Sequence, residues 1–126
     1  MCKPVKEGVN PVNHKINNQD CNIEAGAYLS LIAGWHYDRN LINGATDKDQ
    51  FCKLVQEVGE LSDNICKGQD IRDDIGDIIV VLVNIAERHG VAIQDCLIQA
   101  WNDIKDRRGT MVDGVFIKEE PLKLLT

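Results

Sequence analysis

Residues 70–90 have the sequence DIRDDIGDIIVVLVNIAERHG, and this stretch decides the fold. Its isoleucine, leucine and valine side chains recur at intervals of three and four and cover most of the circumference of a helix. Asp70 can cap the start of this helix, the acids of the first turn suit the helix dipole, and Gly90 ends it. We expect so apolar a helix to be buried on several sides, including by a second copy of the chain.

Helical spacing of apolar residues continues on both sides of this stretch. It predicts further helices over 23–39, 46–66 and 93–108. Thr46 begins a capping box for the second of these, because an acid stands three residues later. Asp113-Gly114, between two short apolar runs, predicts a β-hairpin over 110–117. The expected fold is all-α, with an antiparallel four-helix bundle-like core and a short C-terminal β-hairpin.

Composition is typical of one globular domain. The chain has 126 residues, of which 44% are hydrophobic and 27% charged. We expect an irregular N-terminal arm over 1–20 and a helical domain over 21–126. No apolar run suits a membrane span or a signal peptide, so a cytoplasmic location is the default expectation. The five cysteines include no C-x-x-C pair and are expected to be reduced rather than to bind zinc.

The charge balance limits the classes of partner. The net charge of −6 disfavours a protein that binds duplex nucleic acid, since such proteins need a basic surface. An acidic protein can still bind a phosphate ligand when a cation accompanies it.

Two short acidic motifs carry the chemistry. Glu57 and Glu60 stand three apart on one predicted helix, and Asp74 and Asp77 repeat the spacing on the next. Residues three apart share a helix face, and a short connection makes successive helices antiparallel neighbours. The four carboxylates can therefore converge, and their repulsion favours a hard divalent cation such as Mg²⁺. Either motif is also common on a solvated helix face, and that interpretation stays open.

Around these acids the chain resembles the MazG-like, all-α nucleoside triphosphate pyrophosphohydrolases, whose motif is Glu-Glu-x-x-Glu followed by Glu-x-x-Asp. The matching segments are KLVQEVGEL at 53–61, DIGDIIVVLVNIAERHG at 74–90 and IKDRRG at 104–109, within a likeness over residues 23–118. Gln56 and Asp74 depart from the motif, since each stands where the family has glutamate.

The resemblance implies an activity and a cofactor. The reaction is the hydrolysis of ribo- or deoxyribonucleoside triphosphates to the monophosphate and pyrophosphate. Mg²⁺ is the implied ion, with Mn²⁺ as a substitute, held by Glu57, Glu60 and Asp77. Asp74 is one methylene shorter than glutamate, so its contact with the metal would be looser or mediated by water. The residues that would contact the substrate are Gln50, Lys53, Asn84, Lys105, Arg107, Arg108 and Trp35.

Each substrate contact has a structural alternative. Asn84 can be a buried polar residue instead of a contact to sugar or base, and Trp35 can be a core residue instead of a stacking surface. Lys53 can simply pair with Glu57. Lys105, Arg107 and Arg108 can instead complement the helix dipole, because they stand in the last turn of the predicted helix. Gly109 is the glycine expected directly after that helix.

Other functions compete with this one. A dUTP- or dCTP-type pyrophosphatase of the same superfamily would use the same acids. A non-catalytic helical dimerisation or regulatory module would explain the apolar helix but give the acids no role. A di-iron carboxylate bundle needs Glu-x-x-His motifs, which the sequence lacks. We also expect a homodimer or a dimer of dimers with its site near a subunit boundary, because the helix over 70–90 is apolar on several faces.

Overall fold

The computed structural model describes residues 24–119, and the arm predicted over 1–20 lies outside them. Four helices precede a two-stranded antiparallel sheet. The elements are α1 (Ala25–Asp38), α2 (Asp47–Cys66), α3 (Arg72–Arg88), α4 (Ile93–Ile104), β1 (Gly109–Val112) and β2 (Val115–Lys118). The mostly helical character and the C-terminal hairpin are therefore confirmed. None of the helices in the described part is both long enough and apolar enough to cross a membrane.

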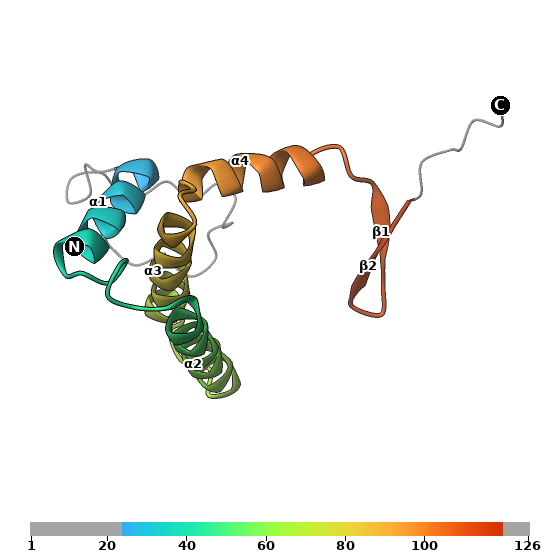
Figure 1. Ribbon diagram of the computed structural model, residues 1–126. Coiled ribbons are helices and arrows are strands. Elements are labelled where there is room, and N and C mark those ends of the chain that lie inside the picture. The colour runs from blue at the N-terminus through green and yellow to red at the C-terminus, as the bar shows by residue number, and fades with distance from the viewer. Residues whose placement is uncertain (1–23, 120–126) are drawn as a thin grey trace, which may run out of the picture.

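The antiparallel pair of α2 and α3 forms the body of the molecule, and α1 packs against α3 (Figure 1). The capping box at the start of α2 is confirmed. The hydroxyl of Thr46 accepts the backbone N–H of Asp49 at 3.1 Å, and the carboxylate of Asp49 accepts the backbone N–H of Thr46 at 3.1 Å. Gly68, with φ 67°, lets the chain turn after α2.

The start of α3 departs from the prediction, whereas its end agrees with it. The cap residue is Ile71 rather than Asp70, whose carboxylate instead accepts the backbone N–H of Arg72 at 3.0 Å and pairs with the Arg72 guanidinium. Asp70 still accepts a hydrogen bond from one free backbone amide of the first turn, although it lies one residue before the cap. Gly90, with φ 69°, follows the end of α3 as expected.

A buried polar network joins α1, the loop after it and α3. The His36 ring donates from Nε2 to the carbonyl of Val80 at 2.8 Å, which leaves Nδ1 as an acceptor. The Asn84 amide nitrogen lies 3.2 Å from that Nδ1 and donates to the carbonyl of Leu41 at 3.1 Å. Because Asn84 is 0% exposed, these bonds replace water at its amide nitrogen, whereas its Oδ1 is buried without a hydrogen-bond partner in the described part of the chain.

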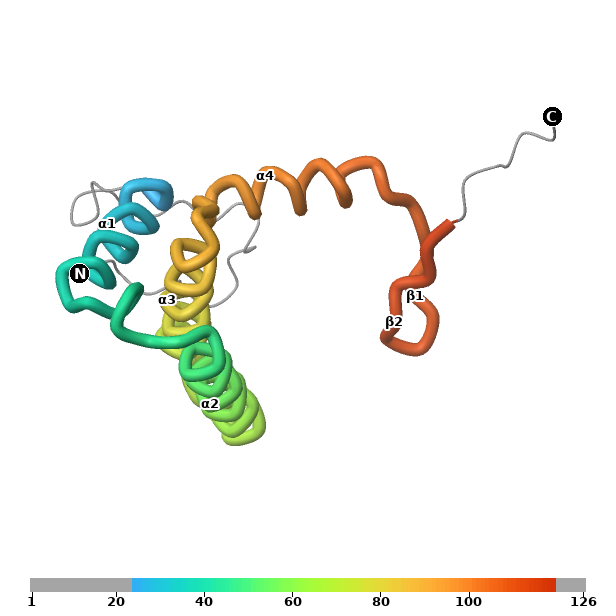
Figure 2. The backbone as a smooth tube through the Cα atoms, in the orientation of Figure 1, coloured from blue at the N-terminus to red at the C-terminus, as the bar shows by residue number. Residues whose placement is uncertain are grey.

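α4 and the hairpin, residues 93–118, form a projection that we call the distal arm. α4 contacts α1 and α3, whereas the hairpin contacts no other described helix or strand. Figure 2 shows the arm leading away from α2 and α3. The type of hairpin is the predicted one, since Val112 pairs with Val115 and the two turn residues have φ 49° and 80°.

The prediction for the end of the last helix was wrong. α4 stops at Ile104, four residues short of the expected end at 108, because the chain turns there to enter β1. Gly109 is not a residue after a helix but the first residue of β1, paired with Lys118. A side chain at Gly109 would overlap the carbonyl of Ile117 and the ring of Phe116, so the close approach of the strands requires glycine.

Candidate metal centre

Three of the four predicted carboxylates converge where α2 lies against α3. Glu57 and Glu60 come from α2 and Asp77 from α3, and one oxygen of each lies within 4.8 Å of the others. We call these three residues the acidic cluster. Glu57 is buried, Asp77 is partly exposed and Glu60 is exposed, so the cluster runs from the interior to solvent. A cation could therefore approach from the side of Glu60.

Glu57 is the residue that distinguishes this cluster from ordinary surface acids. Its Oε1 pairs with the ammonium of Lys53 at 2.9 Å. Its Oε2 is buried and has no hydrogen-bond partner. A buried carboxylate oxygen without a partner is energetically costly, and a divalent cation at the cluster would remove that cost.

The acids of the cluster also repel one another. The negative charge of Glu57 is the main cause that raises the pKa of Glu60, and the close approach of the two carboxyl groups and burial add to it. Burial is the first cause that raises the pKa of Asp77, and the charges of Asp73, Glu57 and Asp74 follow. Both directions mean that the charged form of the carboxyl group is disfavoured here, by neighbouring acids at Glu60 and first by burial at Asp77.

Asp74 does not join the cluster. It is 6% exposed, and both of its carboxylate oxygens accept hydrogen bonds from the side-chain amide of Asn64, at 3.0 and 2.9 Å. The short side chain reaches across to α2 instead of toward Asp77, although its charge still contributes to the raised pKa of Asp77. This role of Asn64 was not predicted, although the residue lies one helical turn after Glu60 on the same face of α2.

The predicted substrate contacts are dispersed. Lys53 lies beside Glu57, and Gln50 precedes it by three residues on α2. Asn84 is buried in the network with His36, which agrees with the alternative that it is a buried polar residue. Trp35 is not a core residue, because it is 44% exposed and the guanidinium of Arg39 lies 4.6 Å from its ring centre.

The three predicted phosphate-binding cations lie far from the acidic cluster of their own chain (Figure 1). Lys105, Arg107 and Arg108 are exposed at the corner between α4 and β1, and no ion pair within residues 24–119 involves them. They do not lie in the last turn of α4 as predicted, because Lys105 is the C-cap residue and the two arginines follow it. Lys105 still lies at the negative end of the helix dipole, so that interpretation stays open for this residue. Figure 1 shows this corner well separated from α2 and α3.

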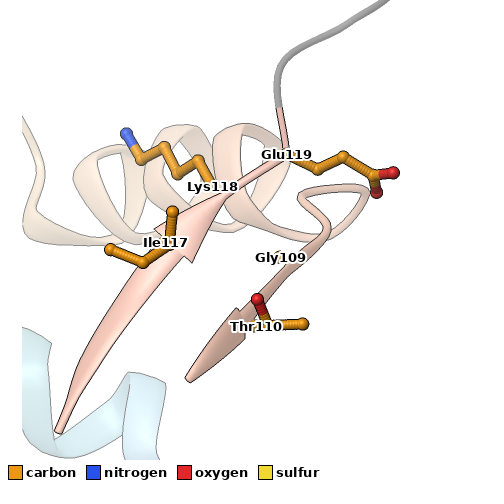
Figure 3. A pocket seen from close by; sticks show the side chains of 5 residues that line it. All are labelled: Gly109, Thr110, Ile117, Lys118 and Glu119. Atoms are coloured by element: carbon orange, nitrogen blue, oxygen red, sulfur yellow. The ribbon is translucent and has the colours of Figure 1, made fainter. Parts of the chain in front are cut away.

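A hollow of about 280 Å³ lies at the open end of the hairpin. Its lining contains none of the predicted site residues and consists of Gly109, Thr110, Ile117, Lys118 and Glu119. Figure 3 shows the side chains of Lys118 and Glu119 pointing in opposite directions. All of these residues are exposed, so the hollow lacks the converging polar groups of a ligand site.

Comparisons with known proteins assign no activity. No family model matches the chain, and no solved structure is similar to it. The chain is 38% identical over 65 residues to a protein of Haemophilus phage HP1 (strain HP1c1) named "uncharacterized 18.2 kDa protein in rep-hol intergenic region". The similarity covers 50% of this chain and 40% of the relative, so the chain matches less than half of the relative's length. The function therefore has to be inferred from the side chains of the site.

Proposed function

We propose that the protein is a magnesium-dependent nucleoside triphosphate pyrophosphohydrolase with a MazG-like domain over residues 21–126. The observation that carries this proposal is the buried, unpartnered Oε2 of Glu57 beside two further carboxylates. The resemblance of the two acidic motifs to the MazG-like pattern supports it. The same three acids could serve a dUTP- or dCTP-type enzyme of that superfamily.

The residues of the site have separate tasks in this proposal. Glu57, Glu60 and Asp77 would hold Mg²⁺, for which Mn²⁺ can substitute, because carboxylate oxygens are preferred ligands of hard cations. The bound ion would supply positive charge to the phosphates and lower the pKa of a water molecule. Lys53 fixes the orientation of Glu57. Asp74 would act indirectly, since Asn64 holds its carboxylate outside the cluster.

The first prediction concerns the metal. Pyrophosphate release should stop in the presence of a chelator and return with excess Mg²⁺ or Mn²⁺, because the three carboxylates alone repel a polyphosphate. The measurement is pyrophosphate detection over a panel of ribo- and deoxyribonucleoside triphosphates. Preference within the panel decides between a general enzyme and a dUTP- or dCTP-type enzyme. Full turnover in chelator would contradict the metal site, and hydrolysis of no triphosphate would favour a dimerisation or regulatory module.

The second prediction links metal binding to pH. Since the pKa values of Glu60 and Asp77 are raised, part of the cluster holds protons at pH values where ordinary carboxylic acids are ionised. A cation must displace those protons, so its affinity should increase as the pH rises above the range in which ordinary carboxylic acids ionise. Calorimetry of Mn²⁺ binding in buffers of different ionisation enthalpy measures the proton release. Equal affinity and no proton release across that rise in pH would refute the linkage.

We also propose that the protein is a homodimer or a dimer of dimers, in which a second copy completes the bundle-like core. On α3, Ile75, Ile79 and Leu82 remain 44%, 37% and 37% exposed. A groove of about 440 Å³ crosses this region, and we call it the apolar groove. Its lining from α1, α3 and α4 consists of Ala25, Tyr28, Leu29, Ile32, Gly76, Ile79, Leu82, Ile93 and Leu97. So apolar a surface is typical of an interface between subunits.

The third prediction tests this assembly. Light scattering at micromolar concentration should give at least the mass of two chains, and Leu97→Asp should shift the protein to one chain, because a charge in the apolar groove would be buried on association. Gln99→Asp adds the same charge to an exposed polar position of α4 and should leave the mass unchanged. A monomeric parent protein would count against the proposal.

A further inference from the structure

The groups needed to bind a metal–triphosphate complex are divided between two parts of the chain. The acidic cluster lies on α2 and α3, whereas Lys105, Arg107 and Arg108 lie at the far end of α4. Figure 1 shows that the corner between α4 and β1 lies away from α2 and α3. One chain therefore does not bring the two groups together.

The acidic cluster by itself is short of positive charge for this ligand. Lys53 is already paired with Glu57 at 2.9 Å, and no other ion pair within residues 24–119 involves an acid of the cluster. A bound divalent ion would offset the carboxylates, but a triphosphate adds several further negative charges. Recognition of its phosphates requires cations from elsewhere.

The outer part of the distal arm, from the end of α4 through the hairpin, is not covered by the described part of its own chain. Trp101 of α4 is 60% exposed, and Met111 and Phe116 of the hairpin are 66% and 43% exposed. A hairpin of two strands that packs against no other described element is marginally stable in water. The exposed apolar side chains thus favour packing of the arm against another protein surface.

Charge complementarity identifies that surface. The stretch from Asp47 to Asp77, which includes α2 and the first turns of α3, has nine acidic and four basic residues. The corner from Lys105 to Arg108 has three cations and one acid. Two copies that each carry a net charge of −6 repel one another overall, and contact between these two regions lowers that repulsion.

We infer that the distal arm of a second copy lies along α2 and α3 and supplies Arg107 and Arg108, assisted by Lys105, to the acidic cluster of the first. These cations bind the phosphates of the triphosphate there, and Arg is suited to bidentate phosphate contacts. Each site then combines acids from one copy with phosphate-binding cations from another. The inference rests on the proposed function for its ligand, but the contact between the copies can be tested without activity.

Complementation of two inactive variants tests the shared site. One copy carries Glu60→Gln, and the other carries Arg107→Ala together with Arg108→Ala, with a different affinity tag on each copy. Each variant alone should be inactive. Dimers that carry both tags should regain about half of the parent activity, because one of their two sites has intact acids and intact cations. They should also bind one non-hydrolysable triphosphate analogue per two chains. Lys48→Ala, an exposed cation of α2 outside the site, is the control that keeps full activity.

The outcomes separate the two proposals. A parent protein that hydrolyses triphosphates while the mixed dimers stay inactive would overturn the inference but not the function. Full activity of the Arg107→Ala/Arg108→Ala variant would overturn it as well. If the parent protein has no hydrolytic activity, the contact between copies can be tested by zero-length cross-linking with a carbodiimide. The sample is a mixture of ¹⁴N- and ¹⁵N-labelled protein. We expect cross-links from Lys105 to Glu57, Glu60 or Asp77 that join peptides of different isotope, and their absence would refute the shared site.

Discussion

Replacing Glu60 with glutamine should lower the rate of triphosphate hydrolysis by about a hundredfold or more, which corresponds to about 2.7 kcal/mol of barrier. The substitution keeps the size of the side chain but removes one of the three converging carboxylates. The loss of a metal ligand weakens the ion that activates water and neutralises phosphate. Steady-state kinetics at saturating Mg²⁺ measure the effect.

The same variant should behave differently in the absence of metal. The pKa of Glu60 is raised in the folded protein, so the folded state favours the protonated acid and loses stability as the pH rises through that pKa. Glutamine cannot ionise, and the metal-free variant should therefore unfold at the same or a higher temperature near neutral pH. The matched control is Asp63→Asn, because Asp63 is an exposed acid of α2 that pairs with Lys67. Parent-like hydrolysis by both variants would rule out the three-carboxylate site.

The elements with local signals were predicted well. α2 and α3 follow from the spacing of their apolar residues, and the start of α2 follows from Thr46 and Asp49, whose hydrogen bonds lie within one helical turn. The Asp113-Gly114 turn is equally local. The end of α4 was missed because residues 105–108 suit a helix by composition, while pairing of Gly109 with Lys118 requires the chain to leave it first.

For the site, the sequence predicted the helix face on which each acid lies and nothing finer. Spacing placed Glu57, Glu60 and Asp77 on facing surfaces, and the structure brings them together. Spacing gives the face on which a side chain lies but not its reach, so it could not show that Asp74 binds Asn64. It also could not show that the cations after α4 lie far from the acidic cluster, because that depends on the direction in which α4 leaves the body (Figure 1).

Replacing Asn84 with alanine should lower the free energy of unfolding by about 2–4 kcal/mol. The side chain is 0% exposed and donates to the His36 ring and to the carbonyl of Leu41. Both acceptors would stay buried without a donor, and the shorter side chain would leave a cavity beside buried Val83. Urea unfolding followed by circular dichroism gives the free energy, and a constant m-value would show that the comparison is valid.

Two further variants separate this structural role from a contact with the substrate. Asn102→Ala changes an exposed residue of α4 and should alter stability by less than about 0.5 kcal/mol. The double variant His36→Phe/Asn84→Leu removes the ring acceptor and its donor together, so it should lose less stability than the sum of the two single changes. If Asn84 served the nucleotide alone, Asn84→Ala would raise KM and leave the unfolding free energy unchanged. The hydrogen bonds to His36 and Leu41 favour the opposite result, in which stability falls in the absence of any nucleotide.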